Sequence, residues 1–179
     1  GVRLVGSEMC IRDRSSSIII AQYGGLRNTS FHRQLIRSAN TTSVRLVPRH
    51  LRTMFETAKG SGDEVNIAVV NGPDPVVLLA GAMSFDHPLD ELKVASALHE
   101  RLYGSELRVF ELSNGVMAPA DSEYVMEARI TQNTDEEGPY VDITGTVDDI
   151  RLEPVIEYDA IHHRAVSYTH LRAHETDSY

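Results

Sequence analysis

The chain has 179 residues, with 26 acidic and 17 basic side chains and a formal net charge of −9 at pH 7. An acidic chain without a basic stripe does not fit a nucleic-acid-binding protein. No apolar run approaches the ~20 residues that a membrane-spanning helix needs. We therefore expect one globular domain that neither binds nucleic acid nor spans a membrane.

The two ends of the chain are related as antisense translations of one DNA string. One allowed coding of LVGSEMCIRD, near the start, gives on its reverse strand the whole of VSYTHLRAHE, near the end. That string resembles a transposase-type sequencing adapter. We therefore expect residues 1–13 and 166–179 to be translated adapter with few contacts to the core, and residues 14–165 to be a fragment of a longer protein. Because Cys10, the only cysteine, lies in an excluded end, cysteine usage indicates nothing about the redox compartment.

The first half of the chain reads as strands around two helices. Runs rich in β-branched and apolar residues predict strands over residues 17–23, 30–36, 43–47 and 64–72. PRHLRTMFETAK predicts a helix that starts at Pro48, because its apolar residues fall on one helical face. DPVVLLAGAM, over residues 74–83, predicts a short buried helix.

The second half contains the clearest helix of the sequence, over residues 88–104. Its apolar stripe comprises Leu89, Leu92, Ala95, Leu98 and Leu102, and Gly104 ends it. Further strands are predicted over residues 106–112, 123–131, 140–147 and 153–163. Strands on both sides of two or three helices predict an α+β domain, for which a barrel is one possible form.

Asn28, His50 and Glu91 could together bind a divalent cation. An amide oxygen, an imidazole nitrogen and a carboxylate form a hard donor set that suits Mn²⁺ or Mg²⁺ better than Zn²⁺. An ion there could bridge to a phosphate, with Arg33 or Arg49 as an additional charge partner. Each ligand alone also has an ordinary explanation, as a turn asparagine, a structural histidine and an acid that compensates a helix dipole.

Glu137 and Asp142 form a second candidate set around the Gly-Pro turn of EGPYVD. A carboxylate pair beside an arginine is a common acid–base device, because the arginine keeps one acid ionised while burial raises the pKa of the other. In an alternating strand Tyr140 and Asp142 share a face, which would place this acid beside an aromatic ring. The alternative is that the TDEEG stretch is an exposed acidic loop.

The order of the motifs resembles the UbiD-type decarboxylase family, whose members use prenylated FMN. The resemblance extends over almost all of residues 14–165 and is carried by the motifs NTSFHR, PRH, GPDPVVLLAGAM, DEL, APADSEYVMEARI, DEEGPYVDITG and IHHR. It implies that this part of the chain is the family's central domain, a flavin-binding split β-barrel with a few packed helices.

The resemblance implies a cofactor-binding role for many of these residues. The family's Mn²⁺ ligands, which link the ion to the cofactor phosphate, correspond to Asn28, His50 and Glu91. The strand that lies along the flavin corresponds to Ser30, Phe31, His32 and Arg33. A K⁺ site near the phosphate would be lined by the backbone of Met83.

The resemblance also implies the catalytic roles. Arg33 corresponds to the arginine that orients the substrate carboxylate, Glu137 to the acid that pairs with it, and Asp142 to the acid that moves the proton. Two positions depart from the common pattern: many members have glutamate in place of Asp142 and proline in place of Ser84.

The implied reaction is the reversible, non-oxidative decarboxylation of an α,β-unsaturated or aromatic carboxylic acid, with prenylated FMN as a covalent electron sink. The YVDITGT stretch is nearer to archaeal-type members, some of which act on an anhydromevalonate phosphate. We further expect a flavin prenyltransferase as the supplier of the cofactor, a homo-oligomeric full-length protein and a cytoplasmic location. The family's first α/β domain and C-terminal domain lie outside this chain, so we expect the fragment alone to be inactive.

Two other functions fit the same sequence. A flavin-binding split-barrel module without decarboxylase chemistry would need the phosphate site but not Arg33, Glu137 and Asp142. A structural fragment without catalytic function would need neither set, and its polar residues would face water.

Overall fold

The structure, a computed structural model, describes residues 17–83, 89–137, 140–141 and 147–164. Asp142, Ser84 and both expected adapter ends lie outside the described residues. Within the described part of the chain, no helix is long and apolar enough to cross a membrane.

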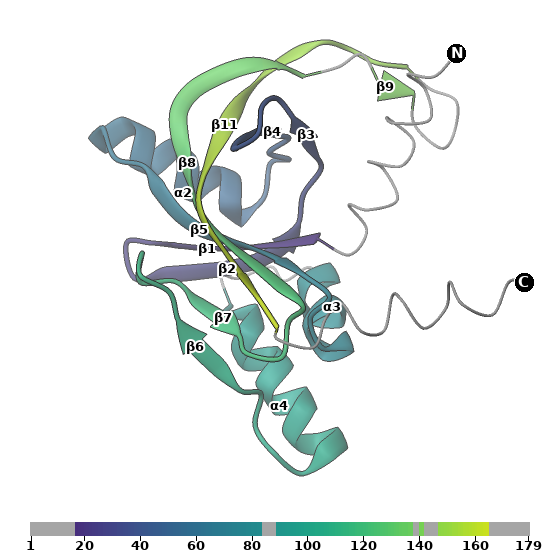
Figure 1. Cartoon of the computed structure of the whole chain (residues 1–179). Helices are drawn as coiled ribbons and strands as arrows, with labels where there is room; N and C mark the ends of the chain where they lie inside the picture. Colours follow the sequence, from purple (N-terminus) through teal and green to yellow (C-terminus); the bar gives the residue numbers. More distant parts are fainter. Residues whose placement is uncertain (1–16, 84–88, 138–139, 142–146, 165–179) are drawn as a thin grey trace, which may run out of the picture.

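A seven-stranded antiparallel sheet organises these residues (Figure 1). In spatial order its strands are β2 (Leu26–Phe31), β1 (Ser17–Tyr23), β5 (Val65–Asn71), β8 (Tyr124–Glu137), β11 (Arg151–His163), β4 (Thr41–Val44) and β3 (Gln34–Ile36). Register shifts between β8 and β11 mark bulges or irregularities, which bend a sheet. An antiparallel sheet packed with helices confirms the predicted α+β class.

The sheet is open, so the structure does not show the closed form of the expected barrel. β2 and β3 are its two edges and do not pair with each other. Only His32 and Arg33 separate these strands in the sequence, and so short a connection spans ~11 Å at most from Phe31 to Gln34. The sheet must therefore curl until its two edges nearly meet, and we call His32 and Arg33, which join them, the seam.

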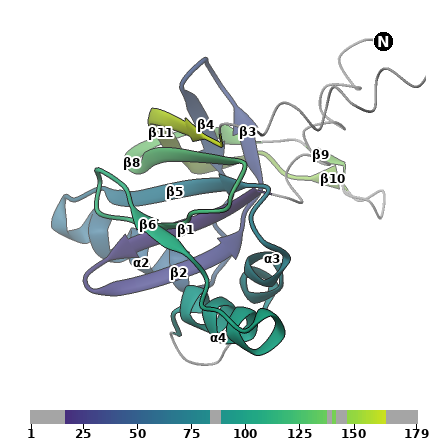
Figure 2. The same cartoon turned by 60° about the horizontal axis from the view of Figure 1, so that its bottom comes forward.

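Helices cover both faces of the sheet (Figures 1 and 2). α2 (His50–Ser61) packs on one face, and α3 (Pro75–Ala82) and α4 (Glu91–Tyr103) pack on the other. In β1, Ile18 and Ile20 belong to the core under α3 and α4, whereas Ile19 and Ala21 belong to the core under α2. Because both of its faces are covered, β1 has an unbroken apolar run instead of an alternating pattern.

The helix boundaries follow the sequence signals with small differences. α2 begins at His50, two residues after Pro48, where the helix was predicted to start. α4 ends before Gly104, whose φ of 74° is a left-handed conformation that suits glycine. Leu89 precedes α4 and Leu102 is 63% exposed, so the buried stripe is shorter than predicted. The end of α4 projects beyond the sheet (Figure 1), and Leu102 and Tyr103 in its last turn are largely exposed.

Two short hairpins lie outside the main sheet in the described part of the chain. One pairs β6 (Val109–Glu111) with β7 (Met117–Pro119), and the other pairs β9 (Tyr140–Val141) with β10 (Val147–Asp148). β7 is not among the predicted strands, because three residues that end in proline carry little strand signal.

Glu127 is a buried acid of β8 that connects several elements. It is 4% exposed, the Ser113 hydroxyl donates to its Oε1, and His162 Nε2 lies 3.4 Å from its Oε2. Burial acts to raise the pKa of Glu127, but its hydrogen-bond partners, Ser113 first and His162 next, lower the pKa by more. The pKa therefore lies below its ordinary value.

This lowered pKa predicts a pH dependence of stability. The Glu127 carboxylate stabilises the fold above the ordinary glutamate pKa, and this contribution is lost as the pH falls through the lowered folded value. We expect the free energy of unfolding in urea to fall less steeply from about pH 6 to about pH 3 in Glu127→Gln than in the wild type. Glu100→Gln, an exposed position on α4, should follow the wild type. A Glu127→Gln curve parallel to the wild type would contradict the prediction.

Candidate functional site

Four elements of the fold meet at one cavity of about 330 Å³. Its lining residues come from β2, the start of α2, the end of α3 and the start of α4: Asn28, Ser30, Pro48, Arg49, His50, Thr53, Met83 and Glu91. The structure thus brings the three predicted metal ligands to one cavity, although Asn28 and Glu91 are 63 positions apart. Thr53 was not among the predicted site residues, although its place one helical turn after His50 was an available signal.

Glu91 joins the start of α4 to the free edge of β2. Because β2 pairs with β1 alone among the described strands, the backbone groups on its other side need partners. The Thr29 N–H donates to Glu91 Oε2 over 2.8 Å, and Asn28 Nδ2 donates to Glu91 Oε1 over 3.0 Å. Burial raises the pKa of Glu91, while hydrogen bonds from Thr29 and Asn28 and the nearby His50 act against this rise. Because Glu91 is buried, it is not simply an exposed acid that compensates the dipole of α4.

An ion pair holds the start of α4 next to Glu91. Arg27 Nη1 lies 2.8 Å from Asp90 Oδ2, and Asp90 Oδ1 accepts a hydrogen bond of 3.1 Å from the Leu92 N–H as the helix cap. Both carboxylate oxygens of Asp90 are therefore used. Neither Arg27 nor Asp90 was among the predicted site residues, because an arginine in a strand and an acid before a helix are ordinary features.

The helix ends on the two sides of the cavity differ in charge. The first turn of α2 has no side-chain cap and no acidic residue, and Arg49 precedes it. The start of α4 instead carries Asp90 and Glu91. The cavity thus lies between one helix N-terminus that lacks an anion and another that has two acids, and an uncapped N-terminus favours anions.

The ring of His32 extends the polar row of β2 into the seam. His32 Nε2 lies 2.9 Å from Ser30 Oγ, and His32 Nδ1 lies 3.1 Å from the Arg45 carbonyl oxygen. Burial lowers the pKa of His32, the hydrogen bond to Arg45 acts to raise it, and the charge of Arg49 lowers it further. The imidazole is therefore neutral near pH 7, and its proton lies on Nδ1 because a carbonyl oxygen can only accept.

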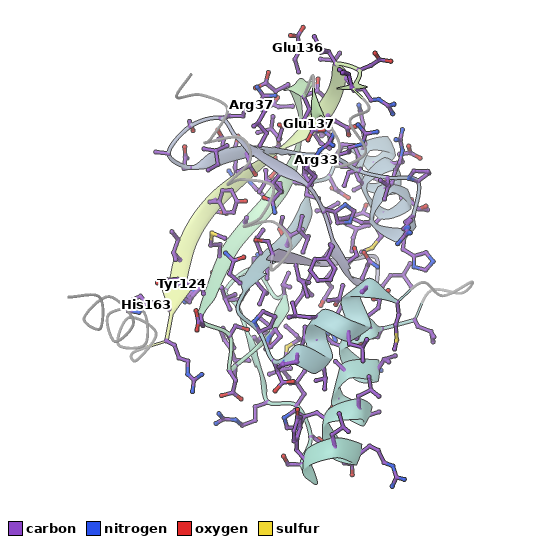
Figure 3. The ribbon with its side chains drawn as sticks, turned by 90° about the vertical axis from the view of Figure 1, so that its right-hand side faces the viewer. Arg33, Arg37, Tyr124, Glu136, Glu137 and His163 are labelled. Carbon is purple, nitrogen blue, oxygen red and sulfur yellow. The ribbon has the colours of Figure 1, made fainter. Side chains whose placement is uncertain are left out.

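Arg33, the other residue of the seam, pairs with Glu137 at the end of β8 (Figure 3). Arg33 Nε lies 3.1 Å from Glu137 Oε1, and Nη2 lies 3.5 Å from Oε2. Glu137 is 1% exposed, so this is a carboxylate buried against a guanidinium. The two predicted partners therefore contact each other, whereas Asp142 lies outside the described residues.

The remaining predicted residues have different surroundings. Phe31 packs against the core under α3 and α4, away from the cavity that Asn28 and Ser30 line. Met83 is 37% exposed and belongs to the cavity lining. Within the described residues, no group of three or more His, Cys, Asp or Glu side chains could hold a metal, so the candidate metal centre depends on the Asn28 amide as its third ligand.

Comparisons with known proteins decide the family. The model of UbiD, described as the 3-octaprenyl-4-hydroxybenzoate carboxy-lyase Rift-related domain, matches residues 14–173. The chain belongs to the UbiD family. The anhydromevalonate phosphate decarboxylase of Methanocaldococcus jannaschii is 39% identical over 137 residues, which are 76% of this chain and 31% of that protein. This UbiD-family chain therefore spans about a third of the length of the curated relatives that it matches.

Solved structures show the same relationship. An evolved dimeric form of the UbiD-class enzyme HmfF from Pelotomaculum thermopropionicum, in complex with prFMN, matches with a TM-score of 0.76 and 31% identity over 83% of this chain and 35% of that chain. The flavin reductase PheA2 matches with a TM-score of 0.50 and 14% identity over 92% of this chain and 89% of that chain. At that identity the likeness concerns the fold alone, so the fold does not by itself separate UbiD chemistry from other flavin proteins.

The Arg33–Glu137 pair predicts an unequal effect of two arginine substitutions. Arg33→Met leaves a buried carboxylate without its partner, and we expect the free energy of unfolding in urea to fall by about 3 kcal/mol. Arg37→Met is the matched control, because Arg37 is similarly exposed but pairs with a half-exposed acid, Asp135. Its loss should be about 1 kcal/mol or less. Equal losses would show that the burial of Glu137 adds nothing to the pair.

Proposed function

We propose that this domain is the flavin-binding part of a prenylated-FMN-dependent carboxy-lyase, which catalyses the reversible decarboxylation of an α,β-unsaturated or aromatic acid. The observation that carries the proposal is the convergence of Asn28, His50 and Glu91 at one cavity. The seam links that cavity to the Arg33–Glu137 pair. Membership of the UbiD family supports the same conclusion.

The residues of the cavity fit a hard divalent cation such as Mn²⁺. Glu91 is a buried carboxylate whose pKa is raised by burial, and a cation beside it would compensate the cost of that burial. Asn28 is hydrogen-bonded to Glu91, and His50 lines the same cavity. We therefore infer that these three side chains hold Mn²⁺. A K⁺ site beside the Met83 backbone is inferred from the family resemblance and from the position of Met83 at the cavity.

The uncapped start of α2 offers a place for the cofactor phosphate. Its free N–H groups and the charge of Arg49 favour an anion, whereas Glu91 on the other side favours a cation. A divalent ion held by Glu91 and in contact with the phosphate would satisfy both sides at once. Ser30 of β2 lines the same cavity as a further hydrogen-bonding group.

Arg33, Glu137 and Asp142 would supply the rest of the chemistry. Bound prenylated FMN would supply a covalent electron sink for the carbon that loses CO₂. Arg33 would orient the substrate carboxylate, and Glu137 would fix the guanidinium in place through its two contacts. Asp142 would deliver a proton to the carbon after the bond to the carboxyl group breaks. Its role rests on the family resemblance.

For the whole protein we infer a substrate of the anhydromevalonate phosphate type. The relatives of that name are 36–39% identical to this chain, while the phenolic acid decarboxylase of Escherichia coli O157:H7 is 28% identical. The same resemblance supports a flavin prenyltransferase as cofactor supplier, a homo-oligomeric full-length protein and a cytoplasmic location.

A flavin-binding module without decarboxylase chemistry is the second candidate, and the likeness to the fold of PheA2 favours it. Such a module would need the phosphate side of the cavity. It would not need an arginine held by a fully buried glutamate, which Arg33 and Glu137 provide. The two candidates therefore differ in whether Glu137 and Asp142 affect turnover.

Two substitutions in the full-length protein, co-expressed with a flavin prenyltransferase, separate the candidates. Asp142→Asn should keep the bound-flavin absorbance and reduce CO₂ release by ~100- to 10,000-fold, because an amide cannot donate a carboxylic proton. Asn28→Ala should lose bound flavin first, because it removes a ligand of the phosphate-bridging ion. Flavin absorbance and CO₂ release are measured side by side.

The control is Asn133→Ala, at an exposed position of β8, which should change neither quantity. Unchanged turnover in Asp142→Asn would favour the flavin module. The isolated fragment should release no measurable CO₂, because water would reach the flavin freely.

A further inference from the structure

Three polar contacts form a row that ends at Asn28. The Arg45 carbonyl oxygen lies 3.1 Å from His32 Nδ1, His32 Nε2 lies 2.9 Å from Ser30 Oγ, and Ser30 Oγ lies 2.8 Å from Asn28 Oδ1. Asn28 and His32 are 4% and 6% exposed, so water is largely excluded from these two members of the row. A serine hydroxyl has one proton, and Ser30 can donate it to only one of its two neighbours.

The Arg45 carbonyl sets the direction of this row. Because a carbonyl oxygen only accepts, His32 carries its proton on Nδ1 and presents Nε2 as an acceptor. Nε2 is satisfied only if Ser30 donates to it. Ser30 must then accept a hydrogen bond from Asn28, which requires the Nδ2 side of the amide.

The structure has the opposite setting of the amide, in which Nδ2 donates to Glu91 and Oδ1 accepts from Ser30. In this setting Glu91 receives a hydrogen bond from Asn28. The Ser30 hydroxyl, however, donates to Asn28, so the neutral His32 has no donor for its Nε2. A half-turn of the amide would satisfy His32 but would aim Asn28 Oδ1 at the Glu91 carboxylate. Two oxygens that face each other repel, unless a cation lies between them.

We propose that His32 is a positioning residue that acts through Ser30 to aim the amide oxygen of Asn28 at the cation. The inference rests on the metal centre of the proposed function and assigns His32 a role other than lying along the flavin. With the cation bound, every polar atom from Arg45 to Glu91 has a partner of the correct kind. Groups that orient metal ligands in this way typically change metal affinity by ~10- to 100-fold when they are removed.

Calorimetric titration of the 179-residue chain with Mn²⁺ tests the proposal. The Glu91→Gln variant measures how much Mn²⁺ binds elsewhere on this acidic chain. Ser30→Ala and His32→Asn should each raise the Kd by ~10- to 100-fold, since asparagine can donate to Arg45 but has no acceptor at the position of Nε2. His32→Gln can place an acceptor oxygen near Ser30 and should recover most of the affinity. Ser122→Ala is the matched control, a buried serine that donates to Pro119 outside the cavity.

The outcomes separate this inference from the proposed metal centre. Site-specific Mn²⁺ binding that is equal in the wild type, Ser30→Ala and His32→Asn would overturn the role of His32 and keep the metal centre. Absence of binding that depends on Glu91 would overturn both. A ¹⁵N NMR measurement of the His32 ring gives an independent readout: a proton on Nδ1 supports the direction of the row, and a neutral ring with its proton on Nε2 overturns it.

Discussion

The contact of the Glu91 carboxylate with the free edge of β2 is the interaction on which the rest of the site depends. An edge strand usually gains its outer hydrogen bonds from water or from another strand. Here a helix begins at that edge, and one side chain takes both the Thr29 N–H and the Asn28 amide. The positions of β2 and α4 are therefore coupled, and the cavity between α4 and α2 takes its shape from that coupling.

The packing behind β2 supports the same arrangement. Gly81 of α3 lies so close to the sheet that an added Cβ would be 3.3 Å from Ile18 Cδ1 of β1 and 3.7 Å from the Thr29 carbonyl oxygen of β2. α3 thus supports β2 from one face while α4 holds its edge. This support lets the protein keep an acid buried at Glu91, at a cost in stability that functional sites commonly carry.

The elements that depend on local patterns could be predicted from the sequence. The helical spacing and Gly104 predict α4, and the unbroken apolar run predicts β1. The break at the seam could not be predicted, because SFHRQLI has no local sign that β2 pairs with β1 while β3 pairs with β4. Strand pairing is set by contacts that are distant in the sequence, so the open sheet could not be predicted from local patterns.

The candidate site also has a part that could be predicted and a part that could not. Spacing alone left Asn28, His50 and Glu91 with ordinary explanations, and the family resemblance was needed to join them. The ion pair of Arg27 and Asp90, which holds the start of α4, could not be predicted, because a pair across 63 positions leaves no periodic signal.

The seam has a mechanical consequence. Two residues connect opposite edges of one sheet, so no slack exists to absorb a shift of either edge. His32 is bound to Ser30 on one side, and its neighbour Arg33 is bound to Glu137 on the other. A displacement of β2 by a bound molecule would therefore be transmitted to β3 and to the end of β8. The two halves of the site would move as one rigid unit, even though no backbone hydrogen bond closes the sheet between them.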